Sequence, residues 1–472
     1  MSEKTHDLII IGAGPGGYRA AFLAADLGLN VTLIDPELNP GGVCLYRGCI
    51  PTKALLHLAR IKTDAEHTED LGIKFSAPQV DIEKVIDWKN KVVKQLTGGL
   101  GQLVKARKIN YLRGRAKFIN SNTLELSGEK DKKEEITFEK VIIATGAKPA
   151  TIPGLDIKSE HLLNSAKALD LKEIPKKMLI IGGGYIGLEM ATIYQAIGTE
   201  ISIVELTNDF MPGMDSDLVT EYKKASQHIF SEVFLETKVE KIEEKGNQLE
   251  VSFMGKNDKS FKKKYNKVLM AVGQVPNSEN LGLENININV DNRGFIKVNK
   301  QQQTSNENIF AIGDIAGQPL LAHKASYEGR VAVEAIAGKK GALNDAKAIP
   351  AVIYTEPEIA TCGLSEKEAK EKNINYKTVK FPWTASGRAV AMNEKSGFTK
   401  LVIDKKSERI LGAGIVGRNA GDMISELVLA IEMAATAEDI ALTIHPHPTL
   451  AETIMESAEM FDGHATHVFT KK

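Results

Sequence analysis

Two stretches of the chain share one pattern of hydrophobic and polar positions. Each is a short apolar run that passes directly into glycines, DLIIIGAGPGG at residues 7–17 and KMLIIGGGYIG at residues 177–187. Each continues into an apolar stretch of helical character and then into a second apolar run, NVTLID (30–35) or EISIVE (200–205). A short apolar run bounded by glycine is typical of a buried strand. Both stretches therefore predict a strand, a turn, a helix and a second strand.

Both turns have the spacing G-x-G-x-x-G. Their glycines are Gly12, Gly14 and Gly17 in the first turn and Gly182, Gly184 and Gly187 in the second. In this motif the first glycine permits the tight turn, the second lets the backbone approach a pyrophosphate, and the third lets the helix pack on the strand. Asp35 and Glu205 end the second strands, each 23 residues after the first glycine, where an acid accepts hydrogen bonds from a ribose. A single motif is also typical of an ordinary strand–helix turn, but its repetition with identical spacing predicts two dinucleotide-binding domains.

Three later runs predict further strands. They are KVIIATGAKP (140–149), KVLMAVGQVP (267–276) and NIFAIGDIAG (308–317). Asp314 lies in the turn after the last run, where it either caps the turn or accepts hydrogen bonds from the polyol chain of a cofactor. From residue 350 onward, strands followed by helices predict an α+β domain.

Length and composition limit the class of protein. A chain of 472 residues is too long for one hydrophobic core, and its net charge of −1 gives no attraction for nucleic acid or an anionic membrane. No apolar run approaches the roughly 18 residues that a membrane span needs. The N-terminal sequence MSEKTHDLIIIG lacks a signal-peptide pattern, so we expect a cytoplasmic protein.

Two of the three cysteines, Cys44 and Cys49, lie in the segment GGVCLYRGCIPTK. Pro51 suits the first turn of a helix, so the pair lies near a helix start, where the dipole and Lys53 favour the thiolate form. A zinc site would need two further ligands, and the third cysteine, Cys362, is distant in sequence. We expect Cys362 to be a buried residue of a strand. Inert thiols are the remaining alternative. The pattern favours a redox-active pair, and we predict no metal site.

The acids and cysteines also indicate which nucleotides bind. A carboxylate at Glu205 repels the 2′-phosphate of NADP, and no Lys or Arg follows through Pro212, so we expect NAD at the second site. The first site lies directly before the cysteine pair, and a flavin links hydride transfer to thiolate chemistry, so we expect FAD there. We predict an α/β fold with two Rossmann-like dinucleotide-binding domains and a C-terminal α+β domain, and the family resemblance given below implies that the last is a dimerisation domain. The predicted boundaries are 1–150 for the FAD-binding domain, 151–277 for the NAD-binding domain, 278–350 for a central segment completing the FAD side, and 351–472 for the interface domain.

The cysteine segment resembles the flavin disulfide reductases, and among them the dihydrolipoamide dehydrogenase family, whose pattern is G-G-T-C-L-N-V-G-C-I-P-S-K. Both cysteines, the glycines, the proline and the lysine match. The departures are Val43, Tyr46, Arg47 and Thr52. The resemblance covers essentially the whole chain. It implies a homodimer that oxidises dihydrolipoamide with NAD, by way of FAD and a Cys44–Cys49 redox disulfide.

The tail TIHPHPTLAET (443–453) contains the second dense motif. From the residues alone, His445 and His447 are typical of a surface turn. The family ends in H-x-H-P-T-L-x-E, and the resemblance implies that His447 is the catalytic base, oriented by Glu452 and supported by His445. It also implies that His447 acts on the cysteines of the other subunit. The His447–Pro448 bond is a candidate cis peptide.

The resemblance adds cofactor contacts to those of the glycine motifs. It pairs Lys53 with Glu189 to tune the flavin. The predicted cofactor contacts are Gly12, Gly14, Gly17, Asp35, Gly42, Lys53, Ala116, Thr145, Gly146, Asp314, Ala322, Gly182, Gly184, Tyr185, Ile186, Gly187, Glu189, Glu205, Val239 and Gly273.

Partners and rival functions follow from the same resemblance. The expected partners are lipoyl-bearing domains of 2-oxoacid dehydrogenase complexes or the glycine-cleavage carrier protein, and an acyltransferase core. The alternative is another FAD-dependent disulfide reductase. A glutathione reductase carries basic residues for NADP after the second strand, and a mercuric reductase ends in a Cys-Cys pair, whereas this chain ends in THVFTKK. An idle subunit within a complex is a further alternative, which the intact cysteine and histidine motifs oppose.

Overall fold

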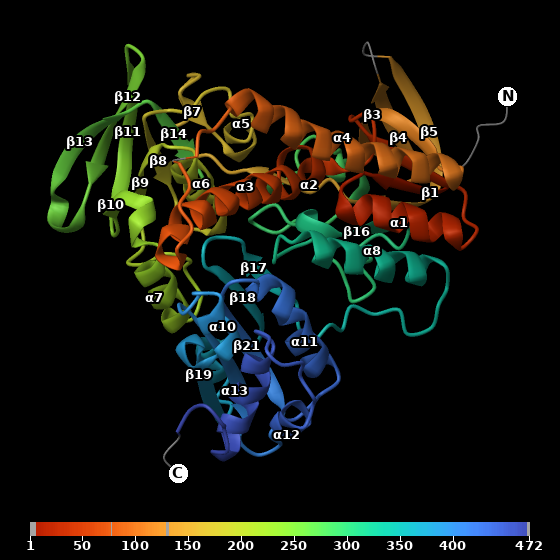
Figure 1. Ribbon diagram of the computed structural model, residues 1–472. Helices are drawn as coiled ribbons and strands as arrows, with labels where there is room; N and C mark the ends of the chain where they lie inside the picture. Colours follow the sequence, from red (N-terminus) through yellow and green to blue (C-terminus); the bar gives the residue numbers. More distant parts are fainter. Residues whose placement is uncertain (1–5, 77, 129–131, 470–472) are drawn as a thin grey trace.

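A parallel sheet forms the centre of the N-terminal unit in the computed structural model, which describes residues 6–76, 78–128 and 132–469 (Figure 1). The strand order is β3–β2–β1–β5–β16, and β16 joins from far along the chain. Beyond the parallel part, β3, β4 and β5 continue as an antiparallel meander. The elements are β1 (His6–Ile11), α1 (Pro15–Asp26), β2 (Val31–Asp35), α2 (Gly42–Arg47), α3 (Cys49–His67), α4 (Ile82–Ala106), β3 (Asn110–Asn120), β4 (Thr123–Gly128), β5 (Lys133–Ile143), β16 (Ile309–Ala311) and α8 (Ala322–Ile336).

The second unit repeats this plan. Its parallel sheet has the order β10–β9–β8–β14–β7, and β11, β12 and β13 form its antiparallel meander. The elements are β7 (Leu162–Leu163), α5 (Ser165–Ala168), β8 (Lys177–Ile181), α6 (Tyr185–Ala196), β9 (Glu200–Val204), α7 (Ser216–Ala225), β10 (Phe230–Phe234), β11 (Lys238–Lys245), β12 (Gln248–Met254), β13 (Ser260–Tyr265) and β14 (Lys267–Met270).

The central strands β1 and β8 are apolar without alternation because helices and meanders cover both faces of each sheet. Leu8 and Ile9 in β1, and Leu179 and Ile180 in β8, are fully buried. Figure 1 shows α1 beside α8 along the first sheet, and α3 runs toward the second unit, where it packs against α6. The predicted order of strand, glycine turn, helix and strand is confirmed at both sites.

Two segments of similar sequence, one after β5 and one after β14, join the two units. β6 (Ala147–Pro149) and β15 (Gln274–Pro276) form a short antiparallel pair, with Ala147 opposite Pro276. Each segment leaves its own parallel sheet and meets the other. The internal duplication therefore also supplies the contact between its two copies.

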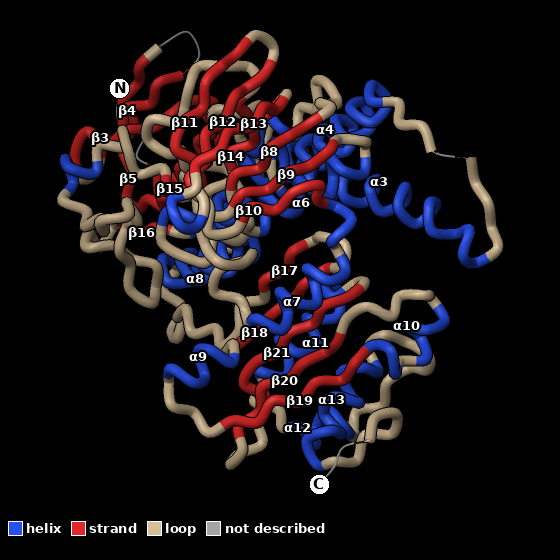
Figure 2. The backbone as a smooth tube through the Cα atoms, turned by 90° about the vertical axis from the view of Figure 1, so that its left-hand side faces the viewer, coloured by secondary structure: helices blue, strands red, loops and turns tan. Residues whose placement is uncertain are grey.

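The C-terminal unit confirms the expected α+β domain and lies below the other two in Figures 1 and 2. Its antiparallel sheet has the order β17–β18–β21–β20–β19, and α11 and α13 pack on it. Cys362 is a buried residue of β18, as predicted. The elements are β17 (Ala351–Ile353), β18 (Glu358–Gly363), α9 (Glu366–Glu371), β19 (Tyr376–Pro382), α10 (Gly387–Ala391), β20 (Phe398–Asp404), β21 (Ile410–Gly417), α11 (Ala420–Glu432), α12 (Ala437–Ala441) and α13 (Glu452–Asp462).

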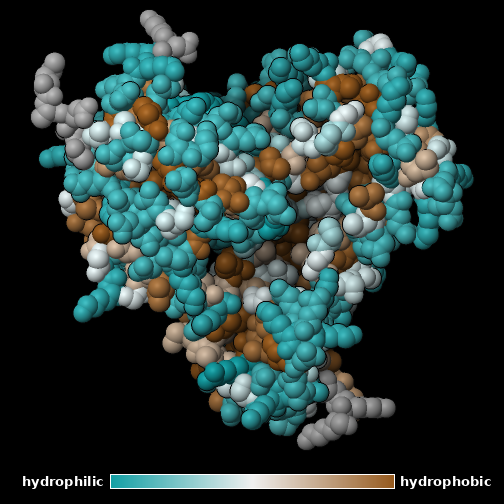
Figure 3. Space-filling view, turned by 180° about the vertical axis from the view of Figure 1, so that it is seen from behind, coloured by the Kyte–Doolittle hydropathy of each residue, from teal (hydrophilic) through white to brown (hydrophobic). Residues whose placement is uncertain are grey.

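The surface is hydrophilic over much of the face in Figure 3, and hydrophobic patches gather in the recess between the upper units and the C-terminal unit. Within the described part of the chain, the helices lack the combination of length and apolar character that crossing a bilayer requires.

A buried lysine fastens the C-terminal unit to the second unit. Lys400 in β20 has a side chain that is only 1% exposed, and its ammonium lies 2.8 Å from Asp215, 2.8 Å from Asp217 and 3.0 Å from Glu366. Asp217 lies in α7 of the second unit. The three carboxylates are close enough together to hold a cation, and that cation is the lysine side chain.

We expect Lys400→Met to destabilise this joint by about 3–5 kcal/mol, because it leaves three carboxylates without their buried counter-charge. Lys380→Met is the matched control, since Lys380 also pairs with Asp217 but is 45% exposed. We expect the control to cost about 0–1 kcal/mol. The midpoint of the first urea transition measures both effects, and equal shifts in the two variants would contradict the prediction.

Candidate active site

The first glycine turn joins β1 to α1 and leaves open space at its middle glycine. A Cβ on Gly12 would lie 2.3 Å from the Ala144 carbonyl oxygen, and one on Gly17 would lie 1.8 Å from the Gly12 oxygen. Gly12 also has a φ of +100°. A Cβ on Gly14 would meet no protein atom within 4 Å. The outer glycines are therefore required by packing, and the middle one leaves room for a phosphate at the helix N-terminus.

The second glycine turn, between β8 and α6, has the same division of roles. A Cβ on Gly182 would lie 2.4 Å from the Ala271 oxygen, and one on Gly187 would lie 2.2 Å from the Gly182 oxygen. A Cβ on Gly184 would again meet nothing within 4 Å. The two turns thus match in sequence spacing and in the space that they leave open.

The two acids after the second strands are buried and bound to the backbone of the turns. Asp35 accepts the Ala13 N–H at 2.7 Å, and Glu205 accepts the Gly183 N–H at 2.7 Å. Burial raises the pKa of Asp35, against the hydrogen bonds from the Ala13 and Glu37 N–H groups. Each carboxylate oxygen can accept two hydrogen bonds, so both acids can still accept hydrogen bonds from a ribose.

The segment that leads into the cysteine pair packs on the first glycine turn. Gly42 has a φ of +57°, and a Cβ there would lie 2.6 Å from the Gly14 Cα. Cys44 lies in the short helix α2 and Cys49 is the first residue of α3, so the predicted position at a helix start is confirmed. Both residues are free thiols. The chain two residues before Cys44 therefore packs on the first glycine turn.

The two thiols have opposite acidities. A hydrogen bond from the Cys44 thiol, assisted by the charge of Lys53 and opposed by burial, lowers the pKa of Cys49 to about 7. The same hydrogen bond, together with burial and the negative charge of Cys49, raises the pKa of Cys44. When the reduced pair loses one proton, the negative charge is therefore favoured on Cys49, while Cys44 holds the remaining proton.

Two of the departures from the family pattern hold the loop that follows Asp35. Tyr46 donates its hydroxyl to the Asn39 carbonyl at 3.0 Å and accepts the Asn39 N–H at 3.3 Å. Arg47 pairs with Glu37. These side chains thus tie α2, which carries Cys44, to the loop after Asp35.

Lys53 is the point where the three units meet. Its ammonium donates to both carboxylate oxygens of Glu189, each at 3.0 Å, so the predicted pair is present. Glu189 is 3% exposed and also accepts the Tyr354 N–H at 3.0 Å. The same ammonium lies 4.3 Å from the centroid of the Tyr354 ring. Helix α3, helix α6 and the C-terminal unit therefore converge one helical turn from Cys49.

Tyr185, in the second glycine turn, lies near the residues around Lys53. Tyr185 is 42% exposed, so desolvation among its neighbours rather than full burial, followed by the charges of Asp314, Glu189 and Cys49, raises its pKa to about 12. Ile186 follows it in α6. The first residues of α6 therefore face the same region as the thiol pair.

The turn that carries Asp314 is held by a buried ion pair. Lys324 and Glu328 of α8 lie 3.0 Å apart, with side chains 7% and 5% exposed. Glu328 accepts the Gly313 N–H at 2.7 Å, and Lys324 donates to the Gly317 oxygen at 2.9 Å. Burial raises the pKa of Asp314, and Lys324 partly offsets it. Ala322 begins α8 beside this turn.

The remaining predicted contacts follow the strands β5 and β14 or lie in the meanders of the two units. Gly146 and Gly273 occupy matching turns with φ values of +69° and +109°. A Cβ on either would meet nothing within 4 Å. Thr145 is fixed by reciprocal hydrogen bonds with Asn277, at 3.1 and 2.9 Å. Ala116 in β3 and Val239 in β11 are buried.

The histidine motif lies on the C-terminal unit. His447 is bonded through Nδ1 to Glu452 at 2.8 Å, and its side chain is 76% exposed. Burial acts to raise the pKa of Glu452, but hydrogen bonds from Thr449 and His447 outweigh it, and the pKa is lowered. His445 is held by Glu426 at 2.8 Å. The His447–Pro448 bond is cis, as anticipated.

A single chain does not bring the histidine to the thiols. In Figures 1 and 2, α12 and α13, which flank the histidine motif, lie at the end of the C-terminal unit away from α2 and α3. Among the described residues, the His447 side chain pairs with Glu452 and with neither cysteine. The chain therefore presents an oriented histidine on one surface and an acidic thiol pair on another.

The sequence did not lead us to predict three residues of this site. Lys324 and Glu328 are spaced i, i+4 in AHKASYEG, which is a local signal for a helix ion pair. Tyr354 has no comparable local signal, because its partners Lys53 and Glu189 are distant in sequence.

The residues fit the expected cofactors. Each glycine turn has an open middle position at a helix N-terminus, and each is followed by a buried acid with unused acceptor capacity. The segment leading into the thiol pair packs on the first turn, which suits a flavin at that turn reacting with sulfur.

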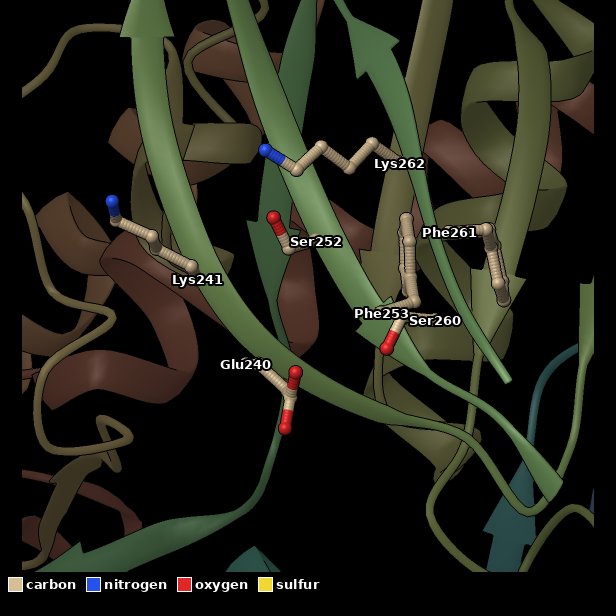
Figure 4. Close-up of a pocket in the computed structure, with 7 residues that line it drawn as sticks. All are labelled: Glu240, Lys241, Ser252, Phe253, Ser260, Phe261 and Lys262. Carbon is tan, nitrogen blue, oxygen red and sulfur yellow. The ribbon is translucent and has the colours of Figure 1, made fainter. Parts of the chain in front are cut away.

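A hollow elsewhere on the surface has a different character (Figure 4). It lies on the meander of the second unit and is lined by Glu240, Lys241, Ser252, Phe253, Ser260, Phe261 and Lys262. The Phe253 and Phe261 rings stack there with centroids 4.8 Å apart. None of the predicted site residues lines it.

Comparison with known proteins supports the resemblance to the flavin disulfide reductases. Residues 6–329 match the family described as pyridine nucleotide-disulphide oxidoreductase, and residues 349–458 match its dimerisation domain. The chain is 48% identical to the dihydrolipoyl dehydrogenase of Vibrio cholerae over 98% of its own length and 97% of the relative. It is 47% identical to the dihydrolipoyl dehydrogenase of Haemophilus influenzae, with coverages of 98% and 96%.

A solved structure shows a similar fold. The HOCl-induced flavoprotein disulfide reductase RclA of Escherichia coli, in its Cu(II) complex, is 28% identical and superposes with a TM-score of 0.87 over 97% of this chain and 99% of the other. The chain therefore belongs to the pyridine nucleotide-disulphide oxidoreductase family, and the two relatives described above, which it matches over nearly their full length, are dihydrolipoyl dehydrogenases.

Proposed function

We propose that the protein oxidises dihydrolipoamide to lipoamide with NAD, using FAD and the Cys44–Cys49 pair. The observation that carries the proposal is the cysteine segment packed at Gly42 on the first glycine turn, with Lys53, one helical turn after Cys49, paired to Glu189. The identity of 43–48% to dihydrolipoyl dehydrogenases over nearly the whole chain supports the substrate. Once bound, FAD accepts two electrons from sulfur and passes them to NAD as a hydride.

The residues of each glycine turn have matching roles in holding these cofactors. Gly14 and the start of α1 receive the FAD pyrophosphate, and Asp35 its ribose. Gly184 and the start of α6 receive NAD, and Glu205 its ribose. Because no basic residue follows Glu205 through Pro212, NADP lacks a partner for its 2′-phosphate.

The two cysteines divide the sulfur chemistry. In the oxidised enzyme they form a disulfide, and a substrate thiolate attacks Cys44, which forms a mixed disulfide and releases Cys49 as the thiolate. The second substrate thiol then displaces Cys44, which takes up a proton, and lipoamide leaves. Cys44 and Cys49 thereby gain the two electrons that the dithiol loses. The low pKa of Cys49 makes it the better leaving group.

His447 is the proposed base that takes the proton from the substrate dithiol. Its Nδ1 is bound to Glu452, which leaves Nε2 to act. Because the side chain is 76% exposed and lies away from the thiols of its own chain, we assign it to the site of the partner subunit. The dimerisation domain that contains it supports this arrangement.

The proposed partners are proteins that carry a lipoyl group, either in 2-oxoacid dehydrogenase complexes with an acyltransferase core or in glycine cleavage. Support comes from the relatives, whose shared name specifies a dihydrolipoyl substrate. We propose the cytoplasm as the location, since a chain of 472 residues with only three cysteines lacks a secreted disulfide framework.

The direct test compares two substrate pairs on the purified holoenzyme. We expect rapid NAD reduction with dihydrolipoamide, and at most about a thousandth of that rate for glutathione disulfide reduction with NADPH, because the buried Glu205 carboxylate opposes the 2′-phosphate. A preference for glutathione and NADPH would assign the chain to the rival reductase class.

The thiol hydrogen bond predicts a difference between two substitutions at Cys44. Cys44→Ser retains a hydroxyl donor to Cys49, whereas Cys44→Ala removes it. We therefore expect the pKa of Cys49 to be higher in the alanine variant, nearer the ordinary thiol value of 9.0. The measurement is a pH titration of the long-wavelength absorbance of a thiolate beside oxidised flavin. Cys362→Ser is the control, and identical midpoints in the two Cys44 variants would refute the hydrogen bond.

Removing the proposed base should slow turnover. We expect His447→Gln to lower the rate of dihydrolipoamide oxidation by roughly 10²–10⁴-fold at neutral pH. NADH oxidation by an artificial electron acceptor, which needs no dithiol base, should stay near the wild-type rate. His464→Gln, at another exposed histidine of this unit, serves as the matched control.

Mixed dimers test whether His447 serves the other subunit. Cys44→Ser and His447→Gln homodimers should each be nearly inactive. When equal amounts are co-expressed, half of the dimers are mixed, each with one intact site, so about a quarter of wild-type activity should return. Failure of activity to return in verified mixed dimers would place both groups in one chain.

A further inference from the structure

Tyr354 brings the C-terminal unit into the redox site. It lies between β17 and β18, and its backbone N–H donates to Glu189 of α6 at 3.0 Å. Its ring lies 4.3 Å from the ammonium of Lys53 on α3. One residue therefore contacts both members of an ion pair that joins the other two units.

The location of Lys53 makes this contact chemically relevant. Lys53 follows Cys49 by four residues on α3, so the two side chains lie on the same helix face. The Lys53 side chain is 34% exposed, whereas that of Glu189 is only 4% exposed. Glu189 therefore fixes one side of the ammonium. The Tyr354 ring provides a second contact, and attraction between a cation and an aromatic face holds the ammonium near the thiol.

We propose that Tyr354 is a positioning residue: its ring holds the Lys53 ammonium against Glu189 and beside Cys49, so that docking of the C-terminal unit sets how readily Cys49 exists as a thiolate. The inference rests on the proposed function, because it assigns a role within that redox site. It concerns the ring alone, since any residue other than proline at this position retains the backbone N–H to Glu189.

The groups that face Cys49 come from every neighbouring element. Cys44 of α2 donates a hydrogen bond to it, and Lys53 of α3 supplies the positive charge. Glu189 of α6 opposes the thiolate. Tyr18 of α1, Tyr185 of α6 and Tyr354 each interact with the Cys49 charge. Lys53 is the cation among these groups. Moving its ammonium away from Cys49 therefore raises the pKa of the Cys49 thiol.

The test uses FAD-loaded protein in the Cys44→Ser background, where Cys49 cannot form a disulfide. The readout is the pH midpoint of the long-wavelength thiolate–flavin absorbance. We expect Tyr354→Leu to raise the midpoint by roughly half a pH unit, because the cation–π contact is lost. Tyr354→Phe keeps the ring and should leave the midpoint unchanged. Tyr327→Leu is the matched control, since Tyr327 is 37% and Tyr354 38% exposed.

A double-substitution cycle separates positioning from general loosening of the structure. Lys53→Met should raise the midpoint on its own, and adding Tyr354→Leu to it should cause no further rise. Flavin content and the melting temperature, measured on each variant, report on folding. A Tyr354→Leu midpoint equal to that of the parent, or a full additional shift in the Lys53→Met background, would overturn the inference. If the Cys44→Ser parent shows no titrating band, the proposed flavin contact of Cys49 fails, and this inference fails with it.

Discussion

The buried carboxylate of Glu189 is the constraint on which the geometry of the site depends. A charge that is 3% exposed must be paired and hydrogen-bonded, because leaving it alone in the interior is costly. Its partners are Lys53 from the first unit and the Tyr354 N–H from the C-terminal unit. Satisfying this carboxylate therefore requires all three units to dock in one arrangement. That arrangement places a cation one helical turn from the reactive sulfur.

The internal duplication explains why two nucleotide sites lie so close together. Each copy has an open glycine turn, a buried acid and a left-handed glycine after the neighbouring strand. The copies differ in the segment that comes after the acid. After Asp35, the loop to Gly42 is fastened by Tyr46 and leads into the thiol pair, whereas after Glu205 the chain leads toward α7 and the Lys400 joint. The two copies thus share the nucleotide-binding scaffold, but one carries the cysteine pair and the other contributes to a structural joint.

Sequence reasoning succeeded where the physical cause is local. The glycine spacing, the acids and the helix start at Cys49 depend on neighbours within a few residues or on one strand–helix–strand unit. The Lys53–Glu189 pair spans 136 residues and was anticipated only through the family resemblance. Tyr354 was not anticipated, because its role arises from the docking of separate units. The opposite acidities of Cys44 and Cys49 likewise depend on which thiol donates the hydrogen bond, and the sequence carries no signal for that direction.

The same physical reasoning bears on why the histidine is so exposed. An imidazole bound to a carboxylate is an oriented base. Glu452 is itself bound by the Thr449 N–H at 2.7 Å, so a second layer of contacts holds the carboxylate that holds His447. His447 nevertheless remains 76% exposed, and the thiols that need a base lie in a different unit. Both features follow if the surface around His447 is completed by a second subunit, since the free monomer must then present the base outward in its working geometry.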